Sequence, residues 1–296
     1  QRPARIVGCL GFVVPILQVV GRYTLYLSPM ARRQRLDREL LDRGLARSRA
    51  QAELLIAERQ VTVNGAVALK AAHLVAPADA IELLASNDWH SRGFDKLLGA
   101  LHDCRIVVAD KQCLDVGAST GGFVQALLDA GARSVAAVDV GTAQLDVRLR
   151  GDGRVAVHEQ TDIRSYVWTL PSPPDLITVD VSFISVTKIA AALRELAGPA
   201  TELLILIKPQ FEVDRAIASR HRGVIREITL HAEVLARVLS SLAEHGLVTT
   251  RLVPSRRKGT KGNQEYFAYA YLGTPPAGDI AENRWQSLIG EALGTG

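Results

Sequence analysis

Short apolar runs alternate with helical patterns over most of the chain, and this alternation restricts the fold more than any other feature. Runs typical of strands cover residues 113–116, 134–139, 175–180 and 203–208, and a further strand is expected at 155–158. The helical patterns that separate them cover residues 123–130, 184–196 and 230–245. Strands that alternate with helices predict an α/β domain with a parallel, doubly wound sheet. Ligands of such sheets bind at the carboxyl ends of the strands.

A glycine-rich segment follows the first of these strands and leads into a helix. It reads Asp115-Val116-Gly117-Ala118-Ser119-Thr120-Gly121-Gly122-Phe123. Glycine allows the backbone to turn sharply and to approach a ligand closely, and the start of the following helix attracts negative charge. The spacing differs from G-x-G-x-x-G and no Lys-Ser or Lys-Thr pair follows, which disfavours a nicotinamide-dependent oxidoreductase and a P-loop enzyme. By itself the segment is compatible with a nucleotide site or with a tight turn.

Two aspartates near later strand ends are candidates for nucleoside contacts. Asp139 ends the second strand, where a carboxylate can accept hydrogen bonds from both hydroxyls of a ribose. Asp162 follows the strand at 155–158, where it either accepts a hydrogen bond from an adenine amino group or caps a turn. Both positions lie at the edge where the ligand of a doubly wound sheet is expected.

Four further ionisable residues stand near the ends of expected elements. Asp180 and Lys208 each end a strand, Glu265 comes just before an apolar strand, and Lys96 lies near the start of the domain. The charge of a lysine is costly to bury without partners. Lys208, directly after five apolar residues, therefore either emerges to solvent or serves a site at the sheet edge. Taken singly, the other three are more often surface or capping residues.

A smaller patterned region precedes this domain. Leucines at helical spacing end before Gly44, and Ser48 is the expected N-cap of a second helix. Alternating valines at 61–63, followed by Asn64-Gly65, predict a strand and a tight turn.

Arginines crowd the two expected helices of the smaller region. They are Arg32, Arg33, Arg35, Arg38, Arg43, Arg47 and Arg49. The planar guanidinium donates two hydrogen bonds together and suits phosphate, which favours a nucleic-acid partner. The alternative is a solvated helix face on which the arginines form ion pairs with Asp37, Glu39 and Asp42.

Composition excludes several classes of protein. Hydrophobic residues make up 48% and charged residues 22% of the chain, which excludes a disordered polymer. Three cysteines exclude a disulfide scaffold and indicate a reducing compartment, and the cysteines and histidines lack the spacing of a structural zinc site. The net charge is only +4, so local clusters matter more than the sum. We expect a cytoplasmic monomer without a metal and without stable membrane association.

The first 29 residues differ in character from the rest of the chain. Arg2 and Arg5 precede an apolar run over 6–20, which resembles a secretory signal peptide. The run is shorter than the roughly 20 residues of a membrane-spanning helix, and no small-residue cleavage site comes after it. We expect residues 1–29 to be an extension outside the functional protein, with Met30 as the start.

The smaller region resembles the alpha-L RNA-binding module of ribosomal protein S-four. The segment that carries the resemblance is RLDRELLDRGLARSRAQAELLIAERQVTVNG, followed by Lys70. The resemblance implies a small α+β RNA-binding domain over residues 33–86. It also implies RNA-backbone contacts, made by Arg35, Arg47, Arg49 and Lys70.

Seven motifs of the larger region occur in order and carry a second resemblance. They are SRGFDKL, CLDVGASTGGF, AVDVG, VDVSFIS, LIKPQFEV, GVIRE and GNQEYF. They closely resemble the TlyA (haemolysin A) family of ribosomal RNA 2′-O-methyltransferases, related to the wider RrmJ/FtsJ-type enzymes. The resemblance implies a class I, Rossmann-like methyltransferase domain at 91–273, after a linker at 87–90 and before a C-terminal tail at 274–296. It implies S-adenosylmethionine as cofactor, cytidine 2′-hydroxyls of ribosomal RNA as acceptors and ribosomal subunits as partners.

The same resemblance implies roles for individual residues. The catalytic tetrad falls on Lys96, Asp180, Lys208 and Glu265. The cofactor contacts fall on Asp115, Gly117, Ala118, Ser119, Thr120, Gly121, Gly122, Phe123, Asp139, Val140, Asp162 and Asp180. Apart from the resemblance, a basic run before Glu265 either grips the RNA backbone near the acceptor or is a solvated loop; it comprises Arg251, Arg256, Arg257, Lys258 and Lys261. Arg92 is a further expected RNA contact. Lys208 would accept the hydroxyl proton, oriented by the two carboxylates, while Lys96 stabilises negative charge on the oxygen.

The sequence departs from the family pattern in few places. Thr142 and Ala143 stand where the family usually has Tyr-Gly, and Asp162 stands where it often has Asn. Two other classes of function remain as alternatives. One is a non-catalytic RNA-binding or ribosome-assembly factor that keeps the fold. The other is a membrane-active haemolysin, suggested by the family's name and by the apolar start of the chain.

Overall fold

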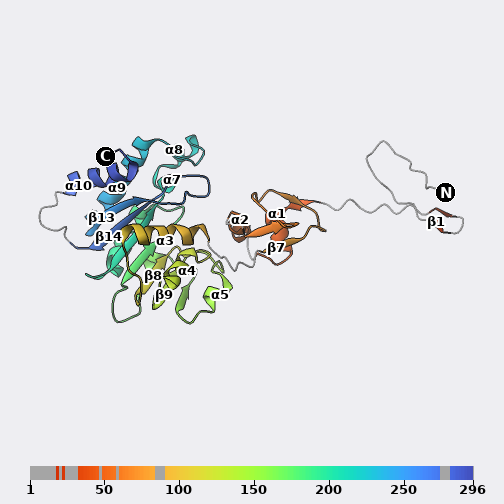
Figure 1. Ribbon diagram of the computed structural model, residues 1–296, viewed down its shortest axis with the longest axis horizontal. Helices are drawn as coiled ribbons and strands as arrows, with labels where there is room; N and C mark the ends of the chain where they lie inside the picture. The colour runs from red at the N-terminus through yellow and green to blue at the C-terminus, as the bar shows by residue number, and fades with distance from the viewer. Residues whose placement is uncertain are drawn as a thin grey trace. The chain divides into compact units, whose positions relative to one another are not determined.

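A computed structural model of the protein describes residues 18–19, 22–23, 33–46, 49–57, 60–83, 91–273 and 281–295. The chain divides into two compact units, Gln1–Leu84 and Ala85–Gly296, and each is considered by itself (Figure 1). Met30, Arg47, Ser48 and the expected linker at 87–90 lie outside the described residues. Within the expected N-terminal extension, β1 (Gln18–Val19) and β2 (Arg22–Tyr23) pair antiparallel.

The smaller unit packs two helices and short strands around its own core. Its helices are α1 (Leu36–Asp42) and α2 (Arg49–Ala57), and its strands are β3 (Gln34–Arg35), β4 (Val61–Val63), β5 (Ala66–Val67), β6 (Leu74–Val75) and β7 (Ile81–Leu83). Strand β4 pairs with β5 and β7, and β3 pairs with β6. Leu36, Leu40, Ile56 and Val61 are buried at its centre.

Two turns predicted for the smaller unit are confirmed by their backbone geometry. Asn64 and Gly65 have φ values of 52° and 80°, as a two-residue hairpin turn between right-handed twisted strands requires. Gly44 has φ 70° just after the end of α1, the left-handed conformation in which many helices terminate.

The larger unit is built on one seven-stranded sheet with the strand order β10-β9-β8-β11-β12-β14-β13. The strands are β8 (Gln112–Val116), β9 (Ser134–Val138), β10 (Val155–His158), β11 (Leu176–Val179), β12 (Glu202–Ile207), β13 (Leu247–Pro254) and β14 (Tyr266–Leu272). The first five in the sheet order are parallel, whereas β14 runs antiparallel to both β12 and β13.

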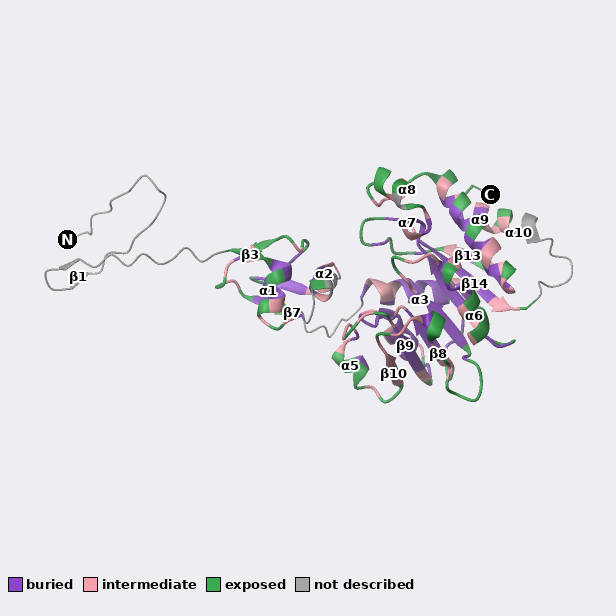
Figure 2. Ribbon diagram, turned by 180° about the vertical axis from the view of Figure 1, so that it is seen from behind, coloured by how far each residue is buried: buried purple, intermediate pink, exposed green. Residues whose placement is uncertain are grey.

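Helices cover both faces of this sheet. They are α3 (Arg92–Cys104), α4 (Gly122–Asp129), α5 (Val147–Arg150), α6 (Ala190–Leu196), α7 (Pro209–Glu212), α8 (Arg215–Arg220), α9 (Ile228–Glu244) and α10 (Ala281–Leu293), with 3-10 turns η1 (Ile163–Ser165) and η2 (Val186–Lys188). Residues of α3 and α4 share one apolar cluster, and residues of α6, α9 and α10 share a second. Figure 2 shows the buried residues concentrated in the sheet and the helix surfaces that face it. The predicted α/β, doubly wound class is confirmed.

Two details of the larger unit differ from the sequence expectation. The sheet is not wholly parallel, because β13 and β14 add an antiparallel edge, and the expected basic run that begins at Arg251 starts inside β13. The helix expected at 184–196 is shorter. Its first part is the turn η2, where the Ser185 side chain accepts a hydrogen bond from Thr187 N, and α6 begins only at Ala190.

No helix within the described residues is long and apolar enough to cross a membrane. Cys104 and Cys113 are free thiols buried in the larger unit.

Candidate active site

The topology of the sheet brings distant segments to one edge. Strands β8, β9, β10, β11 and β12 are parallel, so their carboxyl ends meet there. Strand β14 runs the other way, so it begins at this edge, and Ile207 is the register partner of Tyr266. The residues next to these two, Lys208 and Glu265, therefore lie beside each other although they are far apart in sequence.

The four residues expected to form a tetrad lie here as two ion pairs. Nζ of Lys96, from the first turns of α3, lies 2.7 Å from Oε2 of Glu265. Nζ of Lys208 forms an ion pair with Asp180 and also donates to Oγ of Ser182, at 2.9 Å. Lys96, Lys208 and Glu265 are all buried. Because a buried charge without a partner is strongly unfavourable, each lysine depends on its carboxylate.

A glutamine near Lys208 in sequence contacts the Lys96–Glu265 ion pair. Gln210 lies two residues after Lys208, in α7, and its Nε2 donates to Oε1 of Glu265 at 3.0 Å. Lys96 and Gln210 thus hold the two oxygens of one carboxylate. Gln210 was not among the expected site residues, although the motif LIKPQFEV contains it.

A second residue of that motif fixes the loop that follows Asp180. Glu212 is buried and accepts hydrogen bonds from Oγ of Ser185 and from Val186 N, at 2.5 and 2.9 Å. Burial raises the pKa of Glu212, although these two hydrogen bonds act in the opposite direction. The segment after β11 is therefore tied to the helix that follows Lys208, which orients the Asp180–Lys208 pair. Glu212 was not an expected site residue either.

The motif GVIRE lies against the segment that carries Glu265. Oδ1 of Asn263 accepts a hydrogen bond from Ile225 N at 2.9 Å, and its Nδ2 donates to the carbonyl of Gly223 at 2.8 Å. The carbonyl of Ile225 also lies 3.1 Å from Nε2 of the buried His231. The motif GVIRE thus has a structural role in this chain, because it supports the segment that leads to Glu265.

The glycine-rich loop packs directly on the Asp180 segment. Gly117 has φ 87°, and a Cβ atom there would lie 2.5 Å from the backbone oxygen of Asp180. Gly121 has φ 98° at the N-cap of α4, and a Cβ there would lie 2.2 Å from Cδ1 of Leu149. Both positions require glycine because the backbone is left-handed and the neighbours are close.

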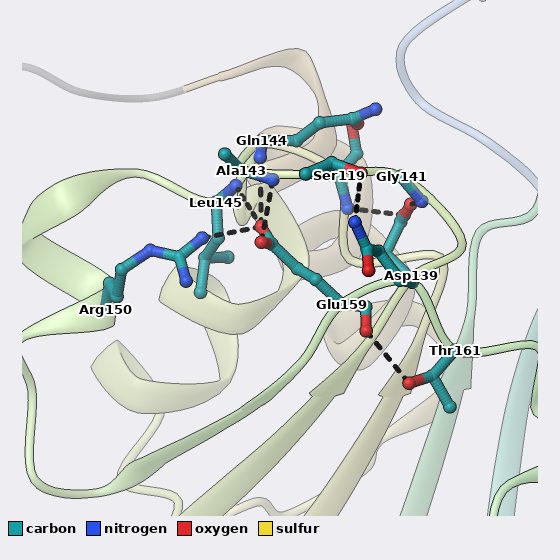
Figure 3. A network of polar contacts seen from close by, with 11 residues as sticks. Ser119, Asp139, Gly141, Ala143, Gln144, Leu145, Arg150, Glu159 and Thr161 are labelled. Carbon is teal, nitrogen blue, oxygen red and sulfur yellow. Dashed lines mark hydrogen bonds and ion pairs between the residues drawn. The ribbon is translucent and has the colours of Figure 1, made fainter. Parts of the chain in front are cut away.

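Asp139 is bound to the glycine-rich loop from the end of the next strand. Its Oδ2 accepts a hydrogen bond from Ser119 N at 2.9 Å, and its Oδ1 accepts one from Gly141 N at 2.6 Å (Figure 3). Val140, the next residue, has 71% of its surface exposed. A carboxylate and an apolar side chain therefore stand together at the sheet edge.

Asp115 lies below the loop and is completely buried in β8. Its Oδ1 accepts a hydrogen bond from Oγ1 of Thr178 at 2.7 Å, and its Oδ2 has no hydrogen-bond partner among the described residues. Burial raises the pKa of Asp115 to about 8, with smaller contributions from the carboxylates of Asp180 and Asp139, and the Thr178 hydrogen bond only partly offsets this. Burial in the folded protein therefore favours the protonated form of Asp115.

Asp162 caps a turn, which is one of the two roles the sequence allowed. Its carboxylate accepts a hydrogen bond from Arg164 N at the start of η1 and pairs with the Arg164 guanidinium. The Arg164 guanidinium and the backbone hydrogen bond lower the pKa of Asp162 to about 2. Its side-chain oxygens are thus already engaged.

An exposed aromatic residue stands beside the Asp180–Lys208 pair. Phe183 has 91% of its surface exposed and a φ of 65°, a left-handed conformation that is costly for a residue with a large side chain. Its ring centroid lies 5.0 Å from that of Phe211, and the Phe211 ring lies 5.8 Å from Nζ of Lys208. Neither phenylalanine was expected as a site residue, although the motifs VDVSFIS and LIKPQFEV contain them.

The three arginines expected to bind RNA in the larger unit have partners within it. Arg256 forms an ion pair and hydrogen bonds with Asp103, and Arg257 lies 2.8 Å from Asp95. Nη2 of Arg92 donates to Oγ1 of Thr260 at 3.1 Å. All three contacts join α3 to the loop at 255–265. In the same loop Lys258 and Lys261 are exposed and have no ion-pair partner within the described part of the chain.

In the smaller unit, two of the expected RNA contacts share one carboxylate. Arg35 donates two hydrogen bonds to Asp37, and Nε of Arg49 lies 3.1 Å from Oδ2 of the same residue. The Arg35 guanidinium lowers the pKa of Asp37 despite the burial of this carboxyl. Lys70 is exposed. The cluster presents two guanidinium groups to solvent. Of the carboxylates that pair with them, Asp37 is buried, whereas Glu53, 3.3 Å from Nε of Arg49, is exposed.

Within the described residues, no three His, Cys, Asp or Glu side chains are arranged as metal ligands.

Comparison with known proteins agrees with this fold. A model of the FtsJ-like methyltransferase family matches residues 89–271, and a model of the S4 domain matches residues 34–81. The chain belongs to the FtsJ-like methyltransferase family.

More specific similarities lie within that family. The chain is 41% identical to the 16S/23S rRNA (cytidine-2′-O)-methyltransferase TlyA of Mycobacterium tuberculosis, over 84% of this chain and 93% of that protein. It is 38% identical to hemolysin A of Brachyspira hyodysenteriae, over 79% of this chain and 98% of that protein. A solved structure described as a hemolysin from Streptococcus thermophilus superimposes with a TM-score of 0.66 at 31% identity, covering 90% of this chain and 97% of the other.

Proposed function

We propose that the protein is an S-adenosylmethionine-dependent 2′-O-methyltransferase that acts on cytidine ribose in ribosomal RNA. The observation that carries this proposal is the pair of lysine–carboxylate ion pairs, Lys96–Glu265 and Lys208–Asp180, at the carboxyl edge of the sheet beside the glycine-rich loop. The similarity to a relative named as a 16S/23S rRNA (cytidine-2′-O)-methyltransferase supports the substrate.

The residues around the glycine-rich loop fit this cofactor. Each oxygen of Asp139 accepts one backbone hydrogen bond and keeps a lone pair for a ribose hydroxyl. Exposed Val140 offers an apolar surface to the adenine ring. Oδ2 of Asp115 is a buried polar atom without a partner among the described residues, directly below the loop. When bound, S-adenosylmethionine supplies an electrophilic methyl group on a positively charged sulfonium.

The protein has to orient the acceptor and remove its proton, because a ribose 2′-hydroxyl is a poor nucleophile. Nζ of Lys208 has to release one of its own protons before it can accept that of the hydroxyl, and its contacts with Asp180 and Ser182 fix its position. Nζ of Lys96, held by Glu265, stabilises the negative charge that develops on the 2′ oxygen. The two ion pairs keep both lysines from turning toward solvent, so the site is organised before RNA arrives.

Exposed Phe183 gives the target base a surface on which to stack. Proteins that recognise RNA commonly stack unpaired bases on aromatic side chains. Phe183 is supported by Phe211 and lies three residues after Asp180. Its left-handed backbone is the kind of local strain that persists where a functional site requires it.

Two groups of exposed basic residues bind the RNA backbone. In the S4-type domain these are Arg35 and Arg49, supported by Asp37, together with Lys70. In the methyltransferase domain they are Lys258 and Lys261, in the loop that leads to Glu265. Contacts to phosphate position the protein on its substrate without reading sequence.

Methyl transfer to purified ribosomal subunits tests the proposal. The protein is incubated with radiolabelled S-adenosylmethionine and subunits from cells that lack the gene, and the RNA is digested and analysed for 2′-O-methylcytidine by mass spectrometry. We expect label in 2′-O-methylcytidine and in no base-methylated nucleoside. Label on a base would contradict the assignment of the acceptor.

Cofactor binding measured by calorimetry distinguishes the enzyme from a non-catalytic assembly factor with the same fold. An RNA-binding protein that does not bind S-adenosylmethionine would leave both the label experiment and the calorimetry negative. That combined result would overturn the proposed function.

A further inference from the structure

One carboxylate organises the loop between β9 and α5. Glu159, the residue after β10, accepts hydrogen bonds from the backbone N–H groups of Ala143, Gln144 and Leu145, at 2.7, 2.9 and 3.3 Å (Figure 3). Its side chain also pairs with Nη2 of Arg150 at 2.6 Å. Successive N–H groups that converge in this way form a concave anion site in many proteins, and here the anion belongs to the chain itself.

The loop needs this support because of its backbone. Ala143 has φ 52°, in the left-handed region that a residue with a Cβ atom occupies at a cost. The conformation at Ala143 turns three consecutive N–H groups toward Glu159. Without a negative partner these partly buried donors would lose the acceptor that they share, so the left-handed turn and the carboxylate depend on each other.

The same contacts keep the Glu159 carboxyl group ionised. Partial burial by itself raises the pKa of Glu159, but the hydrogen bonds from Ala143 and Leu145 and the Arg150 guanidinium outweigh it and lower the pKa below its usual value. The carboxylate therefore stays ionised through the neutral range and well into acid.

The loop continues directly into the cofactor contacts proposed for Asp139. It starts at this aspartate, and Gln160 N donates to the carbonyl of Gly141 at 3.0 Å, so the segment after β10 runs along it. The amide oxygen of Gln144 accepts a hydrogen bond from Oγ of Ser119 in the glycine-rich loop, at 3.4 Å. Ser119 N in turn donates to Asp139. A continuous chain of hydrogen bonds through Gln144 and Ser119 thus leads from Glu159 to Asp139, the carboxylate proposed to hold the ribose.

We infer that Glu159 is a positioning residue for the cofactor's nucleoside: it holds the loop 141–145 in its binding shape and makes alanine tolerable at position 143. This inference rests on the proposed use of S-adenosylmethionine. It concerns a residue that reaches Asp139 through Gln144 and Ser119 and takes no part in the methyl transfer itself.

A double-mutant cycle tests the coupling that the inference requires. Wild type, Glu159→Gln, Ala143→Gly and the double variant are compared by calorimetric affinity for S-adenosylmethionine and by hydrogen exchange of the 143–145 amides in the ligand-free protein. We expect Glu159→Gln to weaken the affinity about tenfold, equivalent to about 1.4 kcal/mol. It should also speed exchange of these amides. Glycine at 143 adopts the left-handed conformation without strain, so Ala143→Gly should bind like wild type and restore at least half of the loss on the logarithmic scale.

A matched control and a second variant keep the test decisive. Asp152→Asn removes a carboxylate that caps a turn and pairs with Arg154 outside this loop, and it should change neither affinity nor amide exchange at 143–145. Glu159→Ala, which removes every acceptor, should exceed the effect of Glu159→Gln if both variants stay folded by thermal unfolding.

Three results would overturn the inference. They are wild-type affinity in both Glu159 variants, weakened affinity with unchanged amide exchange, and a loss of affinity that Ala143→Gly does not reduce. A wild-type protein that binds no S-adenosylmethionine would instead refute the proposed function. The amide-exchange comparison would then still report whether Glu159 shapes the loop.

Discussion

Two clusters of basic residues and carboxylates, one in each unit, use the same pairing chemistry with opposite exposure. In the S4-type domain the carboxylate of Asp37 is buried, and the side chains of Arg35 and Arg49 are 45% and 65% exposed. In the methyltransferase domain the side chains of Lys96 and Lys208 are 10% and 9% exposed. In the first cluster the anion is structural and the cations remain available to a partner. In the second cluster the charges of Lys96, Lys208 and Glu265 are enclosed, so they can act only on a group that enters the site.

The difference decides what each cluster can contribute. The exposed sides of the Arg35 and Arg49 guanidinium groups face water, so these arginines can add phosphate contacts while they keep Asp37 as their partner. Buried pairs are different, because removal of one partner leaves an uncompensated charge and typically costs about 3–5 kcal/mol. Substitutions in the enclosed cluster should therefore change chemistry strongly, whereas substitutions of exposed cations should change RNA affinity more mildly.

Loss of the amine at position 208 should have the largest effect. Lys208→Ala removes the proposed proton acceptor, and we expect kcat for RNA methylation to fall by about 10³-fold or more. The affinity for S-adenosylmethionine should stay within a few-fold of wild type, because the role proposed for Lys208 is with the acceptor and not with the cofactor. The matched control is Lys188→Ala, a lysine at the end of η2 outside the tetrad. Methylation by Lys208→Ala at the wild-type rate would remove this residue from the mechanism.

Asp115 differs from the carboxylates of both clusters, because it is buried and pairs with no cation among the described residues. Its pKa in the folded state is about 8, above the value near 4 of an unfolded aspartate, so the folded state keeps a proton that the unfolded state releases. This contribution to stability is complete below about pH 4 and is lost as the pH rises to about 8, by at most ~1.4 kcal/mol per pH unit.

Denaturant unfolding of wild type and Asp115→Asn from pH 5 to pH 8 measures this effect. An amide cannot ionise. The free energy of unfolding of Asp115→Asn should therefore rise relative to that of wild type as the pH increases. A difference between the two proteins that stays constant over this range would show that Asp115 is ionised throughout.

Neutralisation of the exposed arginines should weaken RNA binding without affecting chemistry. In the Arg35→Ala/Arg49→Ala double variant we expect the RNA KM to rise about tenfold and the salt dependence of binding to lose a slope of roughly 1–2, since two phosphate contacts disappear. The kcat at saturating RNA should remain as in wild type. Arg133→Ala, an exposed arginine of the larger unit, controls for loss of charge. A fall in kcat at unchanged KM would mean that the smaller unit acts on catalysis instead.

The mildest effects should distinguish two kinds of basic residue in the loop at 255–265: exposed lysines and an arginine that has a partner. Lys258→Ala and Lys261→Ala should each raise the RNA KM a few-fold and leave the melting temperature unchanged. Arg256→Ala should instead lower the melting temperature and leave the RNA KM unchanged, because this arginine pairs with Asp103 and its aliphatic stem packs on Gly99. If Arg256→Ala instead raises KM without loss of stability, Arg256 is an RNA contact, which is one of the two roles that the basic run in the sequence allowed.

The sequence predicted the architecture of the larger unit well but missed its antiparallel edge. Strand β10 lies at 155–158 as predicted, and strands β8, β9, β11 and β12 lie within one residue of their expected limits. Strand β13 was missed because an edge strand that carries Arg251 and other polar residues does not stand out as an apolar run. The helix expected at 184–196 begins late, because Ser185 and Glu212 fix η2 ahead of it.

The amino-acid sequence alone predicted the alternation of strands and helices, because apolar periodicity is a local property of the chain. Its resemblance to a known family, carried by the order of the motifs, supplied the residues proposed as a tetrad. Only the tertiary structure decided how these residues are partnered. The antiparallel return of β14 brings Glu265 beside Lys208, and the packing of α3 brings Lys96 to Glu265. Arg256 and Arg257 turn inward to Asp103 and Asp95, while Glu159 closes the loop at 141–145. Such contacts join residues far apart in sequence, and burial and distance, which decide whether a charge binds, catalyses or supports, exist only once the chain has folded.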